Sequence, residues 1–226
     1  MSEIIFAGQT SVGKPLTPTE EGVLSNHVLD YLAWGNSFLY DLFAKNMNAI
    51  KAGVEVAKEK FNAQFKGLLA GDNEIGIQLI RPGQIMRTAA TTEAANNTWS
   101  FSFAASGDYY VGYSTSNTTA ANIDKEVLLL VLGVAFTQGT APTVEELYWT
   151  IGQTTYPVSV IRAAWFADNK NQVRACRTHP MFLEPKQTVL VQSYSIAAAT
   201  QELVLLGVAI GYGRFLRKTS YSSIAT

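Results

Sequence analysis

The pattern of hydrophobic and polar residues changes near residues 70–73. Before this point, apolar residues recur at steps of three and four, which is the period of an amphipathic helix. After it, apolar and polar residues alternate and turn sequences recur, as in β-strands. The pattern predicts an extended arm over residues 1–18, a helical segment over residues 19–70 and a β-sandwich domain over residues 71–226.

The helical segment opens with a start signal, a proline between two threonines followed by two acids. Its residues are Thr17, Pro18, Thr19, Glu20 and Glu21. No further proline occurs before residue 70. One unbroken helix of this length would extend about 70 Å, which exceeds the diameter of a domain of this size. We therefore expect the helix either to break, with Gly35 and Gly53 as candidate positions, or to project from the domain.

The apolar residues of this segment are too numerous for one face of a lone helix. Residues 43–68 keep one apolar stripe, whereas residues 23–42 are apolar on several faces. We expect a share of these side chains to meet neighbouring subunits. The candidate oligomer-interface residues are Tyr31, Trp34, Phe38, Leu42, Met47, Ile50, Val54 and Phe61. The competing explanation is that the helix folds back and covers one face of the chain's own β domain.

Short strands are expected after the helical segment. They cover residues 74–80, 84–90, 98–104, 108–114, 126–136, 158–166, 172–177, 187–195 and 202–212. Between two of them, Thr143 precedes Glu146 by three residues, the spacing of a capping box, which predicts one short helix. The fold class is therefore mainly β with N-terminal α: an antiparallel β-sandwich preceded by a long helical segment.

Charged residues are sparse. They make up 15% of the 226 residues, below the roughly 25% typical of soluble domains. Two explanations stay open: much of the surface faces protein partners, or the plentiful small polar residues solvate it. The net charge is −1, so no overall field attracts nucleic acid or acidic membranes.

The N-terminus and the apolar runs bear on localisation. Glu3 and a short apolar patch do not resemble a signal peptide, so we expect synthesis in a cytoplasm. The longest apolar run, residues 127–136, is shorter than the roughly 20 residues of a membrane-spanning helix, so we expect no membrane span. Cys176 is the one cysteine, so no intrachain disulfide can form.

Candidate catalytic and cofactor motifs fail on residue type or spacing. Residues 8–14 match the G-x-x-x-x-G-K phosphate loop, but Pro15 replaces the hydroxyl residue that binds magnesium. Cys176 and His179, three apart on a strand, would point to opposite faces. His27 lies within the apolar helix, where a packed or interface histidine is the commoner outcome. We expect no enzyme, no metal and no cofactor.

The end of the chain is basic and carries aromatic residues. Arg214, Arg217 and Lys218 are candidate nucleic-acid contacts on this ground. Three charges without a wider basic patch favour an ordinary solvated strand end.

Residues 75–216 resemble the jelly-roll coat and accessory proteins of icosahedral viruses and phages. The resemblance lies in the many short strands, in loops rich in Ala, Thr, Ser and Asn, and in the closing pair KQTVLVQSYS and QELVLLGVAIGYGRFLR. An N-terminal arm or helix ahead of the sandwich is also usual there. The resemblance implies a jelly-roll-like sandwich and a self-assembling structural subunit of a virus particle.

Such a subunit would be a capsid, capsid-decorating or tail-associated protein of the virion. Its partners would be other copies of itself, in a homo-oligomer, and other virion proteins. The alternative is a trimeric receptor- or glycan-binding module in which the helix forms a coiled-coil stalk.

Overall fold

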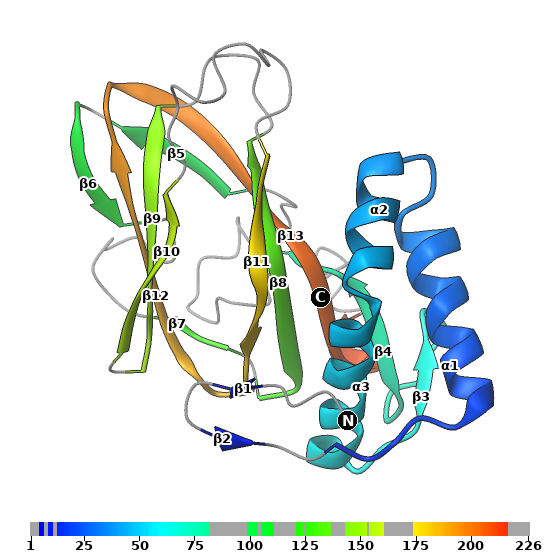
Figure 1. The fold of residues 1–226 in the computed structure, drawn as a ribbon. Coiled ribbons are helices and arrows are strands. Elements are labelled where there is room, and N and C mark those ends of the chain that lie inside the picture. Colours follow the sequence, from blue (N-terminus) through cyan, green and yellow to red (C-terminus); the bar gives the residue numbers. More distant parts are fainter. Residues whose placement is uncertain are drawn as a thin grey trace, which may run out of the picture.

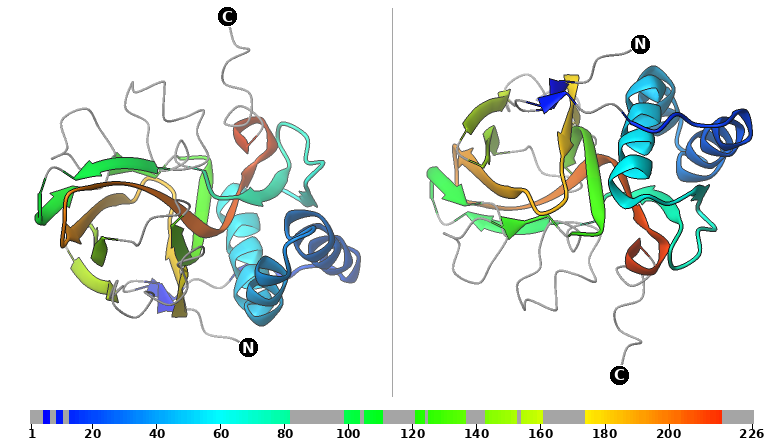
Figure 2. Two further views of the ribbon diagram at one scale, coloured as in Figure 1. Left: turned by 90° about the horizontal axis from the view of Figure 1, so that it is seen from above. Right: turned by 90° about the horizontal axis from the view of Figure 1, so that it is seen from below.

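The computed structural model describes residues 5–6, 9–10, 13–81, 99–103, 105–110, 121–123, 125–136, 143–152, 154–160 and 174–216. A helical part at the N-terminus is followed by two β-sheets, and the helices pack on the outer face of one sheet (Figures 1 and 2). The chain is thus built from N-terminal helices and a β-rich part.

The helical segment is broken and folded back on itself. Helix α1 (Pro18–Ser25) continues directly into the π-helix η1 (Asn26–Leu32), and α2 (Ser37–Lys45) and α3 (Met47–Phe61) return beside them (Figure 1). The break lies in the turn over residues 33–36, where Gly35 has a φ of 71°, a conformation that glycine adopts without steric cost.

Gly53, the other candidate break, lies inside α3 and serves packing instead. A Cβ atom on Gly53 would lie 3.0 Å from the ring of Phe182 and 3.1 Å from the Cδ1 atom of Ile210. The missing side chain therefore lets α3 approach the sheet closely.

The start of α1 agrees with the start signal in the sequence. Thr17 is the N-cap, and its hydroxyl accepts a hydrogen bond from the backbone N–H of Glu20. The carboxylate of Glu20 in turn accepts one from the backbone N–H of Thr17, which completes a capping box. This local prediction is confirmed.

Two sheets form the β part. Their strands are β3 (Phe65–Gly67), β4 (Ile75–Leu79), β5 (Trp99–Phe103), β6 (Gly107–Tyr110), β7 (Ala121–Asn122), β8 (Val127–Phe136), β9 (Val144–Ile151), β10 (Thr154–Val160), β11 (Arg174–Leu183), β12 (Thr188–Ser195) and β13 (Ala199–Tyr212). One sheet has the order β11-β8-β13-β4-β3, with β5 also paired to β13. The other has the order β10-β9-β12-β6, with β7 also paired to β12. In the arm, β1 (Ile5–Phe6) and β2 (Gln9–Thr10) pair with each other.

The pairing along the chain is nested. Strand β4 pairs with β13, β6 with β12, β8 with β11, and β9 with β10, each antiparallel. The first strands of the β part therefore lie beside its last strands, and the middle ones beside each other.

The expectation of a purely antiparallel fold needs one correction, because β3 pairs parallel to β4. A crossover between parallel strands usually takes a dozen or more residues. Here β3 has only three residues, so the chain has a short distance to cover between the end of β3 and the start of β4. The connection over residues 68–74 is long enough for this. The strand β3 also lies inside residues 19–70, which the periodicity assigned to helix.

The predicted short helix after Pro142 is wrong, because β9 occupies its place. Strand β9 pairs with β10 on one edge and with β12 on the other. Thr143 makes no helix cap: its side-chain oxygen lies 3.1 Å from the hydroxyl of Ser195. Long-range pairing on both edges outweighs the local capping signal.

The predicted strands otherwise overlap observed ones. Those over residues 74–80, 98–104, 126–136, 187–195 and 202–212 match β4, β5, β8, β12 and β13 to within a few residues. Those over residues 108–114, 158–166 and 172–177 overlap β6, β10 and β11, and the one over residues 84–90 lies outside the described residues.

The core continues on both faces of β8. Leu128, Leu130 and Leu132 are buried in one cluster with α3 residues such as Ile50 and Val54. The intervening β8 residues Val127, Leu129 and Val131 are also buried but lie outside that cluster. Burial on both faces explains why this strand reads as a continuous apolar run. The helices thus cover one face of their own sheet, as the competing explanation for the helical segment had it.

Candidate interaction surface at the helical turn

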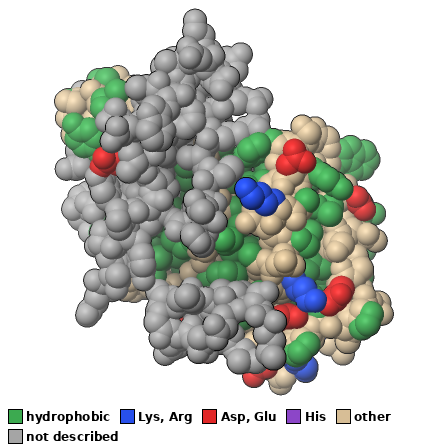
Figure 3. Space-filling model, viewed as in Figure 1, with side chains coloured by type: hydrophobic (Ala, Val, Ile, Leu, Met, Phe, Trp, Pro, Cys, Tyr) green, Lys and Arg blue, Asp and Glu red, His purple; other side chains and the backbone are tan. Residues whose placement is uncertain are grey.

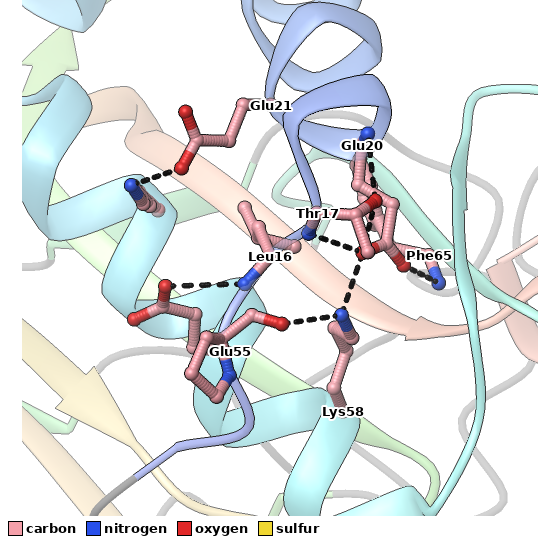
Figure 4. Close-up of polar contacts among 9 residues, drawn as sticks. Leu16, Thr17, Glu20, Glu21, Glu55, Lys58 and Phe65 are labelled. Carbon is pink, nitrogen blue, oxygen red and sulfur yellow. Dashed lines mark hydrogen bonds and ion pairs between the residues drawn. The ribbon is translucent and has the colours of Figure 1, made fainter.

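A buried ion pair fixes α1 to α3. The Nζ atom of Lys58 on α3 lies 2.7 Å from Oε2 of Glu20 on α1, and it also donates a 2.8 Å hydrogen bond to the carbonyl oxygen of Pro15 (Figure 4). The two side chains are 5% and 14% exposed. The other oxygen of Glu20 accepts a 3.2 Å hydrogen bond from the backbone N–H of Phe65 on β3. Glu20 therefore links α1, α3 and β3.

These contacts set the charge state of Glu20. Burial, the largest single effect, raises the pKa of this carboxyl group, but Lys58 and the backbone N–H groups of Thr17 and Phe65 together outweigh it and lower the pKa to about 2. Glu20 is therefore ionised at neutral pH and serves as a structural anion.

Gly13 and Lys14, the last two residues of the match to a phosphate loop, lie against α3. The backbone N–H of Lys14 donates to the carbonyl oxygen of Glu55 at 3.0 Å. The backbone N–H of Leu16 donates to the Glu55 carboxylate at 3.4 Å (Figure 4). A Cβ atom on Gly13 would lie 2.5 Å from the backbone of Glu55. Gly13 is therefore accounted for by close packing of the arm on α3.

His27 joins η1 to the turn after β3. Its Nδ1 atom accepts a 2.9 Å hydrogen bond from the backbone N–H of Leu68, and its ring packs edge-on against Tyr31 at 5.6 Å between centroids. Burial lowers the pKa of His27, and an accepting Nδ1 requires the neutral imidazole.

The turn between η1 and α2 carries large aromatic side chains in solvent. Trp34 is 79% exposed, Tyr31 58% and Tyr40 46%. We call these three residues the tip aromatics. In Figure 1 the turn lies at the upper end of the helical part, near the label of α2. Exposed aromatics of this size are costly to leave in water, because fully burying one such side chain contributes roughly 1.5–3 kcal/mol.

A shallow hollow lies beside the tip aromatics, and we call it the tip hollow. Its lining residues are Leu29, Asp30, Ala33, Trp34, Gly35, Asn36, Ser37, Tyr40 and Asp41. The residues come from the end of η1, the turn and the first turns of α2, whose N-cap Asn36 accepts a 3.1 Å hydrogen bond from the backbone N–H of Leu39. The hollow combines two aromatic side chains with two carboxylates.

The predicted interface residues divide into two groups. Leu42, Ile50 and Val54 are buried in the chain's own core, and Phe38, Met47 and Phe61 are partly buried against it. In addition, the rings of Phe61 and Tyr212 lie 5.1 Å apart. Tyr31 and Trp34 remain exposed.

Tyr40 was not among the predicted interface residues, yet it is 46% exposed. The break at Gly35 restarts the helix at Asn36, which changes the side that Tyr40 faces. The signal that could have revealed this is the Gly-Asn-Ser sequence, a helix stop followed by an N-cap.

The candidate nucleic-acid contact Arg214 is already engaged within the chain. Its Nη2 and Nε atoms donate to the Glu126 carboxylate at 2.7 and 3.3 Å, and its Nη1 atom donates to the Asn73 side chain at 2.8 Å. Its guanidinium group also lies 4.6 Å from the centre of the Tyr212 ring. Arg217 and Lys218 lie outside the described residues.

The remaining candidates can be placed only in part. Cys176 and His179 both lie on β11, whose register with β8 shifts after Cys176, but their side chains are outside the described part. Within the described ranges, no three His, Cys, Asp or Glu side chains lie close enough to hold a metal ion. The helices in the same ranges all lack the length and apolar character needed to cross a bilayer.

Comparison with known proteins adds no family to these observations. No model of a known protein family matches the chain, and no curated protein matches it.

Proposed function

We propose that the protein is a self-assembling structural subunit of a virus particle, built on a jelly roll, in the role of a capsid, capsid-decorating or tail-associated protein. The jelly roll is supported by the nested pairing of β4 with β13, β6 with β12, β8 with β11 and β9 with β10. A long antiparallel ribbon that rolls up into two sheets produces this pairing, and viral coat subunits are among the proteins that use it.

The fold alone does not assign the function, because jelly rolls also occur in lectins and cupins. The observation that carries the assembly role is the exposure of the tip aromatics at one end of the helical part. Most other apolar side chains of the helices are buried or partly buried in the chain's own core, whereas these three are exposed and available to a partner. The low charged fraction of 15% supports a surface that is shared with other proteins.

The buried polar groups support a structural role. Among the described side chains, Lys58 and Ser195 are the charged or polar ones that are buried. Lys58 is used to fix the arm and α1 to α3, and Ser195 donates to the carbonyl oxygen of Ala197 at 2.8 Å. Both residues are thus accounted for by contacts that hold the fold.

The alternative of a trimeric binder with a coiled-coil stalk receives less support. A stalk needs a helix that projects from the β domain, whereas α3 contacts β13, β8 and β4. The apolar stripe that would form the seam of a stalk, including Ile50 and Val54, is buried in the chain's own core.

The proposal is tested by the size of the assembled protein. The variant Tyr31→Ser/Trp34→Ser/Tyr40→Ser should shift the protein from particles or closed oligomers to monomers in light scattering and negative-stain microscopy. Because all three side chains are exposed, the backbone fold and its far-ultraviolet circular dichroism spectrum should not change. Ile196→Ser, which removes an exposed hydrophobic side chain after β12, is the matched control and should assemble normally. A wild-type protein that stays monomeric at all accessible concentrations would overturn the proposal.

A further inference from the structure

The charge of the tip hollow is negative. Asp30 and Asp41 line it, and no Lys, Arg or His is among its lining residues. Both carboxylates are exposed, and within the described part of the chain neither takes part in an ion pair. Figure 3 shows acidic, basic and hydrophobic side chains over the helical part at the right.

The helix ends at the hollow do not change this sign. The C-terminal end of η1 contributes about half a negative charge and the N-terminal end of α2 about half a positive one, so their effects largely cancel. Asn36 also caps the α2 end with its side-chain oxygen. Among the lining residues of the hollow, the two carboxylates therefore carry the formal charge.

The aromatic residues of the hollow suit the same kind of ligand. Trp34 and Tyr40 both line it, and the faces of indole and phenol rings attract cations, with Trp the strongest. A guanidinium or ammonium group placed in the hollow could stack on these faces while it neutralises the carboxylates. Arginine fits best, because its planar group is weakly hydrated and can both stack and pair with a carboxylate.

We propose that the tip hollow binds an arginine or lysine side chain of a partner protein, with Trp34 and Tyr40 as the stacking faces and Asp30 and Asp41 as the counter-charges. A neutral sugar could also stack on the aromatic residues, but it would leave the two negative charges uncompensated. A cation neutralises these charges, which is why the structure favours it. The inference rests on the proposed function only in taking the partner to be another virion subunit.

The test uses the full-length protein and short peptides, so it does not depend on assembly. The probe is the acetylated and amidated peptide Gly-Arg-Gly-Arg-Gly, titrated while the indole N–H signal of Trp34 is followed by NMR. The signal is assigned from its loss in Trp34→Phe. We expect a saturable shift with the arginine peptide, weakened by added salt, and no comparable shift with the peptides that carry Gln or Glu instead.

Variants separate the contribution of the carboxylates from that of the aromatic rings. Asp30→Asn and Asp41→Asn should each weaken peptide binding about five-fold, whereas Glu59→Gln, an equal change of net charge on α3, should not. Trp34→Leu should abolish binding, followed through the backbone amide of Gly35, and Trp34→Phe should retain part of it.

Three outcomes would overturn the inference. They are equal binding of the Gln and Arg peptides, no shift at Trp34 up to the solubility limit, or stronger binding of a neutral oligosaccharide such as maltohexaose. The last would assign the hollow to sugars. A protein that binds the arginine peptide but never assembles would refute the proposed function and leave this inference standing. A protein that assembles but does not bind the peptide would refute this inference and leave the proposed function standing.

Discussion

His27 accepts a hydrogen bond at Nδ1 from the backbone N–H of Leu68, with 2.9 Å between the two nitrogen atoms. The contact joins η1, which carries Tyr31, to the turn after β3. It exists only while the imidazole is neutral, because a protonated Nδ1 would face the N–H as a second donor. The helical part therefore contains a contact that mildly acid conditions should break.

This contact predicts a pH dependence of stability. Burial lowers the pKa of His27 below its ordinary value of 6.5, so the unfolded chain binds the proton more readily than the folded one. Stability should be full above pH 6.5 and should fall as the pH drops through the window below it. Urea denaturation between pH 8 and pH 5 measures the effect, with His27→Gln as the reference, since its side-chain oxygen can accept the same hydrogen bond without titrating. Parallel pH curves for the two proteins would contradict the prediction.

The residue before Leu68 has no room for a side chain. Gly67 has a φ of 69°, and a Cβ atom there would lie 1.8 Å from Nδ1 of His27. Gly67→Ala should therefore lower the free energy of unfolding through both backbone strain and a steric clash. Gly152→Ala is the matched control, because Gly152 has a φ of 62° and nothing within 4 Å of the added atom.

We expect the free energy of unfolding to fall by roughly 1 kcal/mol in Gly152→Ala and by at least about 2 kcal/mol more in Gly67→Ala. Combining Gly67→Ala with His27→Ala should recover part of the loss, because the clash is then removed. Equal losses in the two single variants would show that His27 does not occupy the space beside Gly67.

The buried ion pair predicts a contrast between two neighbouring glutamates. Glu20 pairs with Lys58 in a largely buried site, whereas Glu21 pairs with Lys51 where both side chains are about half exposed. Glu20→Gln should lower the free energy of unfolding by roughly 2–3 kcal/mol, since it leaves Lys58 buried without its counter-charge. Glu21→Gln, the same substitution one position later, should cost less than about 1 kcal/mol.

The pair of Glu20 and Lys58 should stabilise the fold less at acid pH. Because the pKa of Glu20 is lowered from 4.5 to about 2, its stabilising effect is present above pH 4.5 and is lost as the pH falls toward 2. Urea denaturation measures the free energy of unfolding of wild type and of Glu20→Gln at pH 7 and at pH 3. The difference between the two proteins should be smaller at pH 3. An undiminished difference at pH 3 would contradict the assigned charge state.

Removing the helices should expose the core. Deletion of residues 1–70 uncovers buried side chains of the six-stranded sheet, such as Leu128, Val208 and Ile210. We expect an insoluble or molten product that binds a hydrophobic dye, because several large side chains would return to water. Deletion of residues 1–12, which keeps the arm contacts from Gly13 onwards, should leave a folded and soluble protein. A soluble, cooperatively unfolding product from the longer deletion would show that the sheet does not need its helices.

Local and periodic features of the fold could be predicted from the sequence. The period of the apolar positions separates the helices from most strands, because a helix or strand with one buried face must repeat with its own geometry. The start of α1 depends on Thr17, Pro18 and Glu20, which lie within four positions of each other. The apolar run of β8 also predicts its strand, although not that both of its faces are buried.

Tertiary structure decided the features that depend on residues far apart in the chain. Glu146 belongs to a strand because β10 and β12 pair with β9 on both edges, which no local signal reveals. Ile50 and Trp34 are both large apolar residues of the same helical segment, yet one is fully buried and the other is 79% exposed. The difference arises because the turn at Gly35 folds α3 onto β8 and β13 and leaves Trp34 at the far end. Which side chains form the tip hollow follows from that turn, because burial is a property of the packed chain and not of residue type.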